Sequence, residues 1–398
     1  MKVRLKLYVI VGAFFVIGST SGCSMKSKPK EINVEVKNNL DFQRKELVSI
    51  YRDQLSGLLK KYSEKDIRVK ILGVNEYLRT QWIDYDHDGK GDELLFEVDI
   101  KANSTVNYSI VTDTVKVPES KVTTYSRFVP ERIDDYAWEN NKVAFRAYGP
   151  VAQQLVEQHK EGGTLSSGID LWFKKVDYSI IDSWYKKNVE NPGYYHIEHG
   201  EGYDPYHVGA SRGTGGAGIW ENDSLQVAKN YISYKTIATG PLRTVFELTY
   251  APWSSYGVHE TKRISLDLDS NFSKFEINLQ SDKQIPNYTV GITLHEKKGE
   301  VNINKVKGWF RHWEAIDSSF VGEGIVLNPA IINTAFANDS KTPDQSNLLI
   351  VLNPETKFTY YAGFAWTGSK QVSDVTEWDE MLGKQAKIIA NPLQVIIK

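Results

Sequence analysis

Short runs in which apolar and polar residues alternate fill the chain from about residue 125 onward. They are rich in β-branched and aromatic residues and are separated by turn residues, which is typical of antiparallel strands. The clearest of these runs are KVAFRAYG, TVFELTYAPW, TKRISLDLD, SKFEINLQS, YTVGITLHE, GIVLNPAII, NLLIVLN and TYYAGFAW. The segments GPVAQQLVEQHK and SIIDSWYKKNV break the pattern with helical spacing. Such closely spaced short strands predict a β-sandwich.

The part of the chain before this region predicts a smaller β-rich domain. RVKILGV, ELLFEVDI and TVNYSIVT have the pattern of strands, whereas ELVSIYRDQLSGLLKKY has apolar residues three and four positions apart and predicts a helix. We therefore predict a small N-terminal β-rich domain at residues 33–120 and a larger β domain, with the catalytic function, at residues 121–398.

The first 22 residues predict a lipoprotein signal peptide. MKVRLK is basic, LYVIVGAFFVIG is a short apolar run, and TSGC follows and resembles a bacterial lipobox. Cleavage before Cys23 would leave that residue as the lipid-bearing N-terminus, followed by a polar tether over residues 23–32. Because Cys23 is the single cysteine, a disulfide, a zinc-thiolate site and a cysteine nucleophile are excluded within one chain.

Composition narrows the choice of partner. The formal net charge is −2 and the lysines are spread along the chain, so nucleic acid is not an expected partner. The 22 tyrosines and 10 tryptophans would suit either stacking on sugar rings or the core of a β-sandwich. The chain has no GxSxG motif, P-loop or dinucleotide fingerprint in a suitable context, so we expect no organic cofactor.

The run DYDHDGKGDE, which begins at Asp84, predicts a structural Ca²⁺ loop. Its carboxylates occupy positions 1, 3 and 5 and a glycine occupies position 6, as in calcium-binding loops. Position 12 is a leucine, however, and a strand follows where an EF-hand would begin its second helix. The alternative is a merely acidic turn. The candidate ligands are Asp84, Asp86, Asp88 and Asp92.

The strongest candidate for a site is YYHIEHGEGYDPYHVGASRGTGGAGIW, which spans residues 194–220. Its glycines allow positive φ angles or close backbone approach, and its titratable groups suit general acid–base catalysis. A metal bound by its histidines is less favoured, because no HExxH or similar zinc signature is present. The residues predicted to be catalytic are His196, His199, Glu201, Tyr203 and Asp204.

Further residues are predicted to bind substrate. In GVHETKRISLDLD, regular alternation places His259 and Arg263 on one face of a strand, where the arginine could clamp a carboxylate. The stretch SRFVPERIDDYAWENNKVAFRAYGP would form either a buried ion-pair network or a wall that faces a carbohydrate. The predicted binding residues are Trp138, His207, Arg212, His259, Arg263 and His295.

Several of these stretches together carry a resemblance to a known family. RFVPERIDDYAWENNKVAFRAYGP, the HGEGYD block, RTVFELTYAPW with ETKRISLDLDS, the GITLHE strand and the DYDHDGKGDELLF loop resemble a family of secreted Bacteroidetes proteins known as a domain of unknown function. The family is associated with polysaccharide-utilisation loci, and an ulvan-degrading member is an oligosaccharide dehydratase. The strand rhythm of the C-terminal half is similar to the galactose-mutarotase-like β-supersandwich.

The resemblance implies an enzyme that removes water from the non-reducing-end glucuronic or iduronic acid of ulvan-type oligosaccharides. The product would be a 4,5-unsaturated uronate, which other enzymes of the degradation pathway, unsaturated-glucuronyl hydrolases, then cleave. Together with the lipobox, it implies an outer-membrane lipoprotein, either periplasmic or on the cell surface, held to the membrane by its lipid anchor.

A β-elimination needs a base for the C5 proton, an acid for the departing C4 hydroxyl and a cation for the carboxylate, which gains charge in the transition state. We predict His199 as the base, Tyr203 as the acid, and Arg263 or Arg212 as the cation. His196, Glu201 and Asp204 would position them, with His259 or His295 as substitute bases. A polysaccharide lyase, a mutarotase or epimerase, and a non-catalytic glycan-binding lipoprotein remain open as alternatives.

Overall fold

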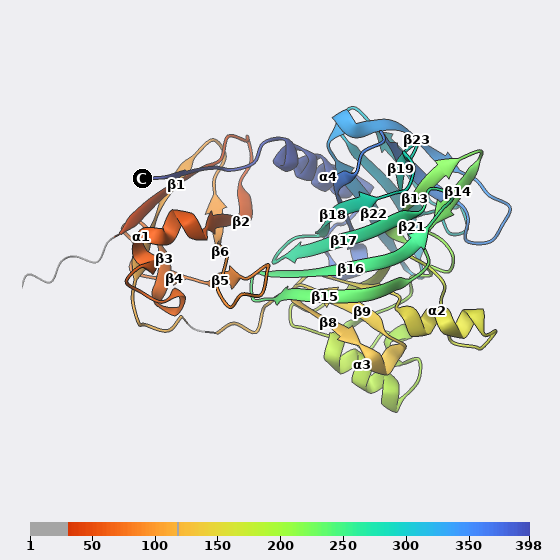
Figure 1. The fold of residues 1–398 in the computed structure, drawn as a ribbon, viewed down its shortest axis with the longest axis horizontal. Coiled ribbons are helices and arrows are strands. Elements are labelled where there is room, and N and C mark those ends of the chain that lie inside the picture. Colours follow the sequence, from red (N-terminus) through yellow and green to blue (C-terminus); the bar gives the residue numbers. More distant parts are fainter. Residues whose placement is uncertain (1–30, 118) are drawn as a thin grey trace, which may run out of the picture.

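The computed structural model describes residues 31–117 and 119–398 and shows two β-rich parts beside each other (Figure 1). The smaller part, called the N-terminal unit below, contains two sheets, and the larger part is a β-sandwich built from three sheets. The predicted signal peptide, Cys23 and nearly all of the tether lie outside the described residues. Within residues 31–117 and 119–398, no helix is both long and apolar enough to cross a lipid bilayer.

In the N-terminal unit, a five-stranded sheet (β26-β1-β7-β3-β4) and a three-stranded sheet (β2-β6-β5) share an aliphatic core. Strands β3, β6 and β7 confirm the three strands predicted here. The bounds are β1 (Ile32–Lys37), β2 (Arg44–Tyr51), β3 (Ile67–Ile71), β4 (Tyr77–Leu78), β5 (Thr80–Ile83), β6 (Glu93–Ile100), β7 (Thr105–Thr112) and β26 (Gln394–Ile397).

The helix predicted for ELVSIYRDQLSGLLKKY is wrong in its first half, which forms β2. Val48 and Ile50 are buried and lie two positions apart, so this segment also has the period of a strand. Pairing along all of β6 gives the backbone of β2 its hydrogen-bond partners, and this tertiary context decides between the two periods. Helical structure is limited to a 3₁₀ turn and to α1 (Ser56–Leu59), where Leu58 packs into the same core.

The C-terminal end of the chain corrects the predicted boundary of the larger domain. Strand β26 pairs antiparallel with β1, so the last residues belong to the N-terminal unit rather than to a domain that runs to residue 398. Before it lies a helix that the strand pattern did not predict, α4 (Val375–Ala390), capped by the Asp374 carboxylate. Trp378 and Leu382 of α4 pack on Gly322 and Gly324 of the sandwich, where a Cβ would collide with them.

The sandwich confirms the predicted mainly β supersandwich architecture. An eight-stranded sheet (β15-β16-β17-β18-β25-β22-β21-β20) and two five-stranded sheets (β12-β11-β10-β9-β8 and β14-β13-β19-β24-β23) contribute side chains to one large core. A parallel bridge between Ile169 and Gly213 joins the two five-stranded sheets. Each of the eight strand runs predicted from the sequence contains at least part of an observed strand.

The strands of the three sheets have the following bounds: β8 (Tyr125–Val129), β9 (Asp135–Glu139), β10 (Val143–Ala147), β11 (Asp170–Lys174), β12 (Gly202–Tyr203), β13 (Thr214–Glu221), β14 (Ser224–Val227), β15 (Tyr231–Thr239), β16 (Arg243–Trp253), β17 (Val258–Asp267), β18 (Phe272–Gln280), β19 (Tyr288–Thr293), β20 (Glu300–Asn304), β21 (Trp309–Ile316), β22 (Ser319–Leu327), β23 (Ile332–Asn338), β24 (Asn347–Leu352) and β25 (Lys357–Trp366).

The two helices predicted within the sandwich are confirmed as α2 (Pro150–Glu157) and α3 (Ile181–Glu190). Helix α3 lies over the sheet that contains β8 to β12 (Figure 1). Its Trp184 and Tyr185 pack against Trp172 of β11, which faces away from the main core. The helix therefore buries the outer face of this sheet, and charged side chains on that face are removed from water.

Candidate functional site

Residues 191–213, between α3 and β13, carry all five residues predicted to be catalytic; we call this stretch the histidine segment. Gly202 has a φ of 111°, and a Cβ there would lie 1.8 Å from the carbonyl oxygen of Phe173. Only glycine fits where the segment pairs with β11, which explains part of its glycine content. Successive side chains then point to opposite sides: Tyr203 packs against the main core, whereas Asp204 is buried on the outer face beside Arg146.

Under the histidine segment lies a buried arginine held by three carboxylates, which we call the arginine cluster. The Arg146 guanidinium lies 2.7 Å (Nε) from Asp170 Oδ2 and 3.0 Å (Nη2) from Asp204 Oδ2. Its Nη1 is 3.8 Å from Asp135 Oδ2. Arg146 and Asp170 are cross-strand partners on β10 and β11, and Asp135 projects from β9. Of the two alternatives predicted for this stretch, the structure shows the buried ion-pair network.

The arginine cluster has one buried guanidinium for three buried carboxyl groups. Burial raises the pKa of Asp135 to about 6, although Arg146 opposes the shift. Burial also raises the pKa of Asp204, well above its usual range, and that of Asp170. The Oδ1 atom of each of the three carboxyls is buried and has no hydrogen-bond partner in the described part of the chain. A single buried guanidinium therefore does not keep all three carboxyls in the charged form.

Replacing Asp135 by asparagine tests this excess of negative charge. A carboxyl whose folded pKa is raised from 3.8 to about 6 binds its proton more tightly in the folded state, so its contribution to stability is lost as the pH rises through about 6. Between pH 4 and pH 8 the wild type should lose on the order of 3 kcal/mol through this group, and Asp135→Asn should not. Urea unfolding at several pH values measures the difference between the two proteins, and a difference that does not change with pH would contradict the assignment.

Three residues cover the arginine cluster toward the surface. The Tyr195 hydroxyl accepts hydrogen bonds from Arg132 Nε (3.2 Å) and Arg146 Nη1 (3.3 Å). His196 Nδ1 bonds to the carbonyl oxygen of Asp204 at 2.8 Å, so Nδ1 carries the proton and Nε2 is left with a lone pair. The His196 side chain is 54% exposed. Arg132 forms no ion pair with any residue that the structure describes.

The backbone just after Arg132 adopts an unfavourable conformation. Ile133 and Asp134 have φ angles of 46° and 63°, and a β-branched residue in this region is a conformational outlier. The turn is held by the Tyr231 hydroxyl, which donates to the carbonyl oxygen of Asp134 at 2.5 Å, and by Gly149, where a Cβ would strike the same oxygen. Strain of this kind persists only where the surroundings fix it, and it is concentrated at functional sites. Here it fixes the position of Arg132.

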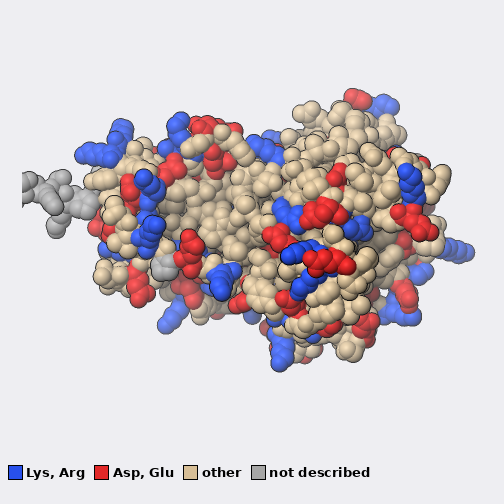
Figure 2. All heavy atoms as spheres, turned by 90° about the horizontal axis from the view of Figure 1, so that it is seen from below, with Lys and Arg blue, Asp and Glu red and all other residues tan. Residues whose placement is uncertain are grey.

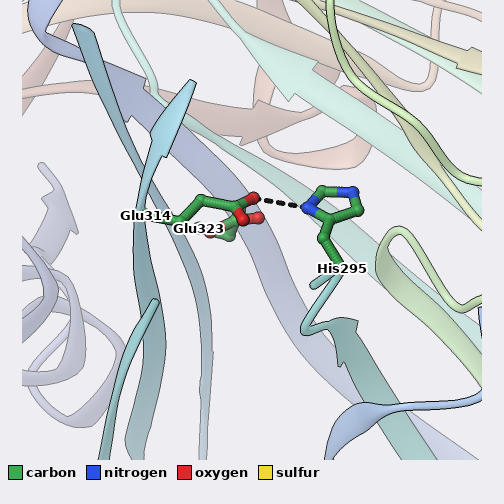
Figure 3. A group of neighbouring side chains, drawn as sticks. All are labelled: His295, Glu314 and Glu323. Carbon is green, nitrogen blue, oxygen red and sulfur yellow. Dashed lines mark hydrogen bonds and ion pairs between the residues drawn. The ribbon is translucent and has the colours of Figure 1, made fainter. Parts of the chain in front are cut away.

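A second group of polar side chains lies inside the sandwich beside the same segment (Figure 3). We call it the histidine–glutamate cluster: His295 after β19, His312 and Glu314 on β21, and Glu323 on β22. His295 Nδ1 lies 2.5 Å from Glu314 Oε1, and His312 Nδ1 lies 3.3 Å from Glu323 Oε2. The second contact is within ion-pair distance but lacks hydrogen-bond geometry, since both ring nitrogens of His312 have no hydrogen-bond partner among the described residues.

The charges of the histidine–glutamate cluster depend on one another. Burial alone would lower the pKa of His295, but the hydrogen bond to Glu314 and the charges of Glu314 and Glu323 together outweigh burial and raise the pKa. Burial also acts to lower the pKa of His312, but the interactions with Glu323 and the charge of Glu314 together outweigh burial and raise the pKa. Burial raises the pKa of Glu323, although His312 opposes it. Without another cation, the two glutamates thus favour protonated imidazoles.

The remaining residues predicted to be catalytic lie in separate surroundings. His199 is exposed and stacks on the Tyr194 ring, with centroids 4.0 Å apart. The Tyr203 hydroxyl donates to Asp317 Oδ2 at 2.5 Å, and burial together with this bond raises the pKa of Tyr203. Glu201 accepts hydrogen bonds from two side chains of the α3 region. In the described part of the chain, no contact joins His199 to Tyr203.

Several predicted binding residues are corrected by their positions. Trp138 is fully buried and donates to Ser273 Oγ, so it belongs to the core rather than to a carbohydrate-facing wall. Arg212 is 2% exposed, and burial lowers its pKa to about 10. Its guanidinium donates to the Ser167 hydroxyl and to two backbone carbonyls, so it is in no position to clamp a substrate.

His259 and Arg263 share a partly exposed face of β17, as predicted, but it is the face turned away from the sandwich core. Arg263 is already paired with Glu247 there and lies over the Tyr85 ring. Both residues are thus separated from the histidine segment by the eight-stranded sheet. His207 is an exposed part of the segment, and its ring lies 3.3 Å from Asp344. His295 belongs to the histidine–glutamate cluster.

The acidic loop gathers three of its four predicted calcium ligands. One carboxylate oxygen each from Asp84, Asp86 and Asp88 lies within 4.8 Å of the others. Asp92 lies outside this group, and its Oδ2 accepts the backbone N–H of Tyr85. The loop could hold Ca²⁺ with backbone oxygens or water completing the shell, and the ion stays a prediction. It lies in the N-terminal unit, away from the histidine segment.

Charge on the surface beside α2 and α3 is mixed. Figure 2 views the molecule from that side, and basic and acidic side chains alternate on it rather than forming fields of one sign. Charge is also mixed in a hollow of about 410 Å³ between the N-terminal unit and the eight-stranded sheet. The lining residues Arg243 and Arg263 are paired there with Asp267 and Glu247. Neither surface therefore carries a field of one sign.

In the comparisons with known proteins, a protein family and a relative each match nearly all of the chain. The family described as "Domain of unknown function (DUF4861)" matches residues 36–395. "Uncharacterized protein P7" from Formosa agariphila is 42% identical over 405 residues, covering 100% of both chains.

Solved structures share the fold. A protein in the glycosyl hydrolase family 38 from Enterococcus faecalis superposes with a TM-score of 0.52 at 10% sequence identity, over 92% of this chain and 47% of that protein. The chain thus spans about half the length of the solved structure that it matches. This identity is low enough that the likeness establishes the fold alone.

Proposed function

The chain belongs to the DUF4861 family, and we propose that it is an oligosaccharide dehydratase that acts on a terminal uronic acid. The observation that carries the proposal is that His196 and Arg132 both contact Tyr195, above the arginine cluster. The ring centroids of Tyr195 and His196 lie 4.6 Å apart, and Arg132 Nε, which has no ion-pair partner among the described residues, donates to the Tyr195 hydroxyl. His196 and Arg132 are the base and the carboxylate-binding cation that the elimination requires. The likeness of the fold to that of a glycosyl hydrolase family 38 protein fits a role in carbohydrate metabolism.

The proposed reaction assigns one task to each residue. Arg132 binds the uronate carboxylate and offsets the charge that builds up as the C5 proton leaves. His196 Nε2 takes that proton, the C5–H electrons form the C4–C5 double bond, and the C4–O bond breaks. The departing hydroxide takes the proton back from the His196 imidazolium and leaves as water, so the enzyme is unchanged. Tyr195 is a positioning residue, because its hydroxyl holds Arg132 against Arg146.

The proposal differs from the sequence-based assignment in the base, the acid and the cation, since Arg132 replaces Arg263 or Arg212. Tyr203 already donates its proton to Asp317, and His199 has no cation beside it that is free to bind a carboxylate. His196 and Asp204, predicted as positioning residues, are retained with new roles: His196 acts as the base, and the backbone carbonyl of Asp204 selects its tautomer.

The test is ultraviolet absorbance of the conjugated 4,5-unsaturated uronate. Full-length protein purified in mild detergent would be incubated with saturated uronate-terminated oligosaccharides, ulvan-type fragments first, and the products would be weighed by mass spectrometry. We expect an absorbance rise, the loss of one water and an unchanged chain length. A rise with shorter chains would identify a polysaccharide lyase instead. Binding without any product would favour the glycan-binding lipoprotein or an epimerase.

We further propose that the protein acts as an outer-membrane lipoprotein through Cys23. The proposal rests on the lipobox-like sequence. A signal of this kind has a basic segment, then an apolar segment, then small residues before the cleavage site, and the chain has them in this order. Labelling of cells with a fatty-acid probe should mark the wild type and leave Cys23→Ala unlabelled. Equal labelling of both proteins would refute lipidation at this residue.

A further inference from the structure

We propose that the histidine–glutamate cluster binds a divalent transition metal ion, with Zn²⁺ as the best match. His295, His312, Glu314 and Glu323 converge from two strands and the loop after β19, and one ligand atom each from His295, Glu314 and Glu323 already lies within 4.8 Å of the others. His312 Nδ1 adds a fourth, 3.3 Å from Glu323 and 4.0 Å from Glu314. The proposal concerns residues outside the proposed reaction and does not depend on it.

The distances from His312 to the two glutamates can be compared with those of a tetrahedral site, whereas His312 lies outside the group of atoms that are all within 4.8 Å of one another. Bonds of about 2.0–2.2 Å from Zn²⁺ to nitrogen and oxygen place neighbouring ligand atoms about 3.3–3.5 Å apart. The His312–Glu323 distance matches this spacing, and the His312–Glu314 distance is slightly longer. The 2.5 Å contact between His295 and Glu314 is a hydrogen bond, which would open slightly when a metal ion replaces the shared proton.

The neighbours of the cluster orient its ligands as the outer shell of a metal site does. His295 Nε2 bonds to the backbone oxygen of His207 at 2.6 Å, which directs Nδ1 toward the cluster. The Tyr206 hydroxyl bonds to Glu323 Oε1 at 3.1 Å and leaves Oε2 for the centre. A ligating histidine almost always donates its second nitrogen in this way.

An independent observation points to a missing ligand. His312 is 0% exposed, and neither of its ring nitrogens has a hydrogen-bond partner among residues 31–117 and 119–398. Glu323 is also 0% exposed, and within the same residues its Oε2 has no partner. Buried polar groups are nearly always satisfied, so such orphans call for a partner. The orphaned Nδ1 and Oε2 face each other in the centre of the cluster, and a bound cation would satisfy both.

The ligand types select the kind of metal. Two imidazole nitrogens and two carboxylates suit Zn²⁺ or another transition metal, whereas Ca²⁺ and Mg²⁺ prefer oxygen ligands alone. Two carboxylates and two neutral imidazoles around a divalent ion have no net charge, which suits a buried position. His295 and Glu314 are 15% and 10% exposed, so the ion has a path from the surface. Four protein ligands leave no open position, so the role is structural and ties β21 and β22 to the loop after β19.

The test uses full-length protein without a histidine tag, stripped with a chelator and titrated separately with ZnCl₂, MnCl₂ and CaCl₂. We expect one Zn²⁺ per chain by calorimetry and by elemental analysis, and a rise in melting temperature of at least about 3 °C at saturation. Glu314→Gln should weaken Zn²⁺ binding by at least about 100-fold, since it removes a ligand but keeps a similar shape and hydrogen-bonding capacity.

Two controls keep the result interpretable. His207→Ala removes an exposed ring but keeps the backbone carbonyl that orients His295, so it should bind Zn²⁺ like the wild type. Glu296→Gln alters an exposed glutamate beside the cluster and should also bind normally. Folding of each variant is checked by circular dichroism. Absence of Zn²⁺ binding in the wild type, equal binding by Glu314→Gln, or binding of Ca²⁺ alone would each overturn the proposal.

Discussion

Replacing Arg146 by methionine is expected to lower the free energy of unfolding by about 3–5 kcal/mol at neutral pH. The guanidinium is buried and is the cation nearest to the Asp135, Asp170 and Asp204 carboxyls, whose side chains are at most 1% exposed. Methionine keeps most of the apolar contacts of the arginine stem but leaves the carboxyls without this charge. Urea unfolding followed by tryptophan fluorescence measures the loss, which should be smaller at pH 5, where the carboxyls are more easily protonated.

The matched control for this prediction is Arg263→Met. Arg263 also pairs with a carboxylate on a neighbouring strand, but its side chain and that of Glu247 are 42% and 24% exposed. Exposed pairs of this kind contribute at most about 1 kcal/mol. If Arg146→Met lowers the free energy of unfolding no more than Arg263→Met does, the charge of Arg146 does not stabilise the arginine cluster. Adding Asp204→Asn to Arg146→Met should recover part of the loss, because one buried carboxyl is then removed.

The fold could be predicted from the sequence wherever the local pattern of apolar and polar residues agrees with the pairing of strands in the folded protein. Most strands of the sandwich have period-two alternation and turn residues at their ends, so their positions follow from the chain alone. The segment of β2 has helical and strand periods at once, and only its pairing with β6 decides. The sequence does contain signals for the start of helix α4, namely the Asp374 cap and Glu377 three residues later. They follow a long series of strands, and the strand pattern was extended over them.

The candidate site was only partly predictable, because a sequence does not show on which side of a segment a residue lies. The histidine segment was identified from its composition, yet Tyr203 and Asp204 are adjacent and point to different sides of the sheet. Arg212 and Trp138 have suitable side chains for sugar binding, and burial removes both from any substrate.

The histidine–glutamate cluster was missed except for His295. Its sequence signal is polar residues at alternate positions of an apolar strand, His312 and Glu314 in WFRHWEAI, facing the core. Neither residue has a metal-binding motif around it, and Glu323 comes from the next strand. Only the antiparallel pairing of β21 with β22 brings the three together, because it sets His312 directly opposite Glu323. Such a pairing cannot be read from spacing within one element.

His196→Ala is expected to lower kcat on a uronate-terminated oligosaccharide by about 10²–10⁴-fold, with a smaller change in KM. In the proposed reaction the imidazole takes and returns the transferred proton, so its loss affects the chemical step, whereas binding of the uronate by Arg132 is kept. Initial rates of ultraviolet absorbance measure both constants. The side chain is 54% exposed and makes its bond to a backbone oxygen, so the variant should retain the fold.

The matched control is His199→Ala, which removes the same kind of exposed side chain three residues later in the same segment. His199 stacks on Tyr194 and lies beside no unpaired guanidinium, so its removal should leave kcat within about threefold of the wild type. The opposite outcome, a large loss in His199→Ala and little in His196→Ala, would restore the base predicted from the sequence. Wild-type activity in both variants would show that neither residue is the base. The third histidine of the segment, His207, is paired with Asp344, and the neighbouring His295 is paired with Glu314.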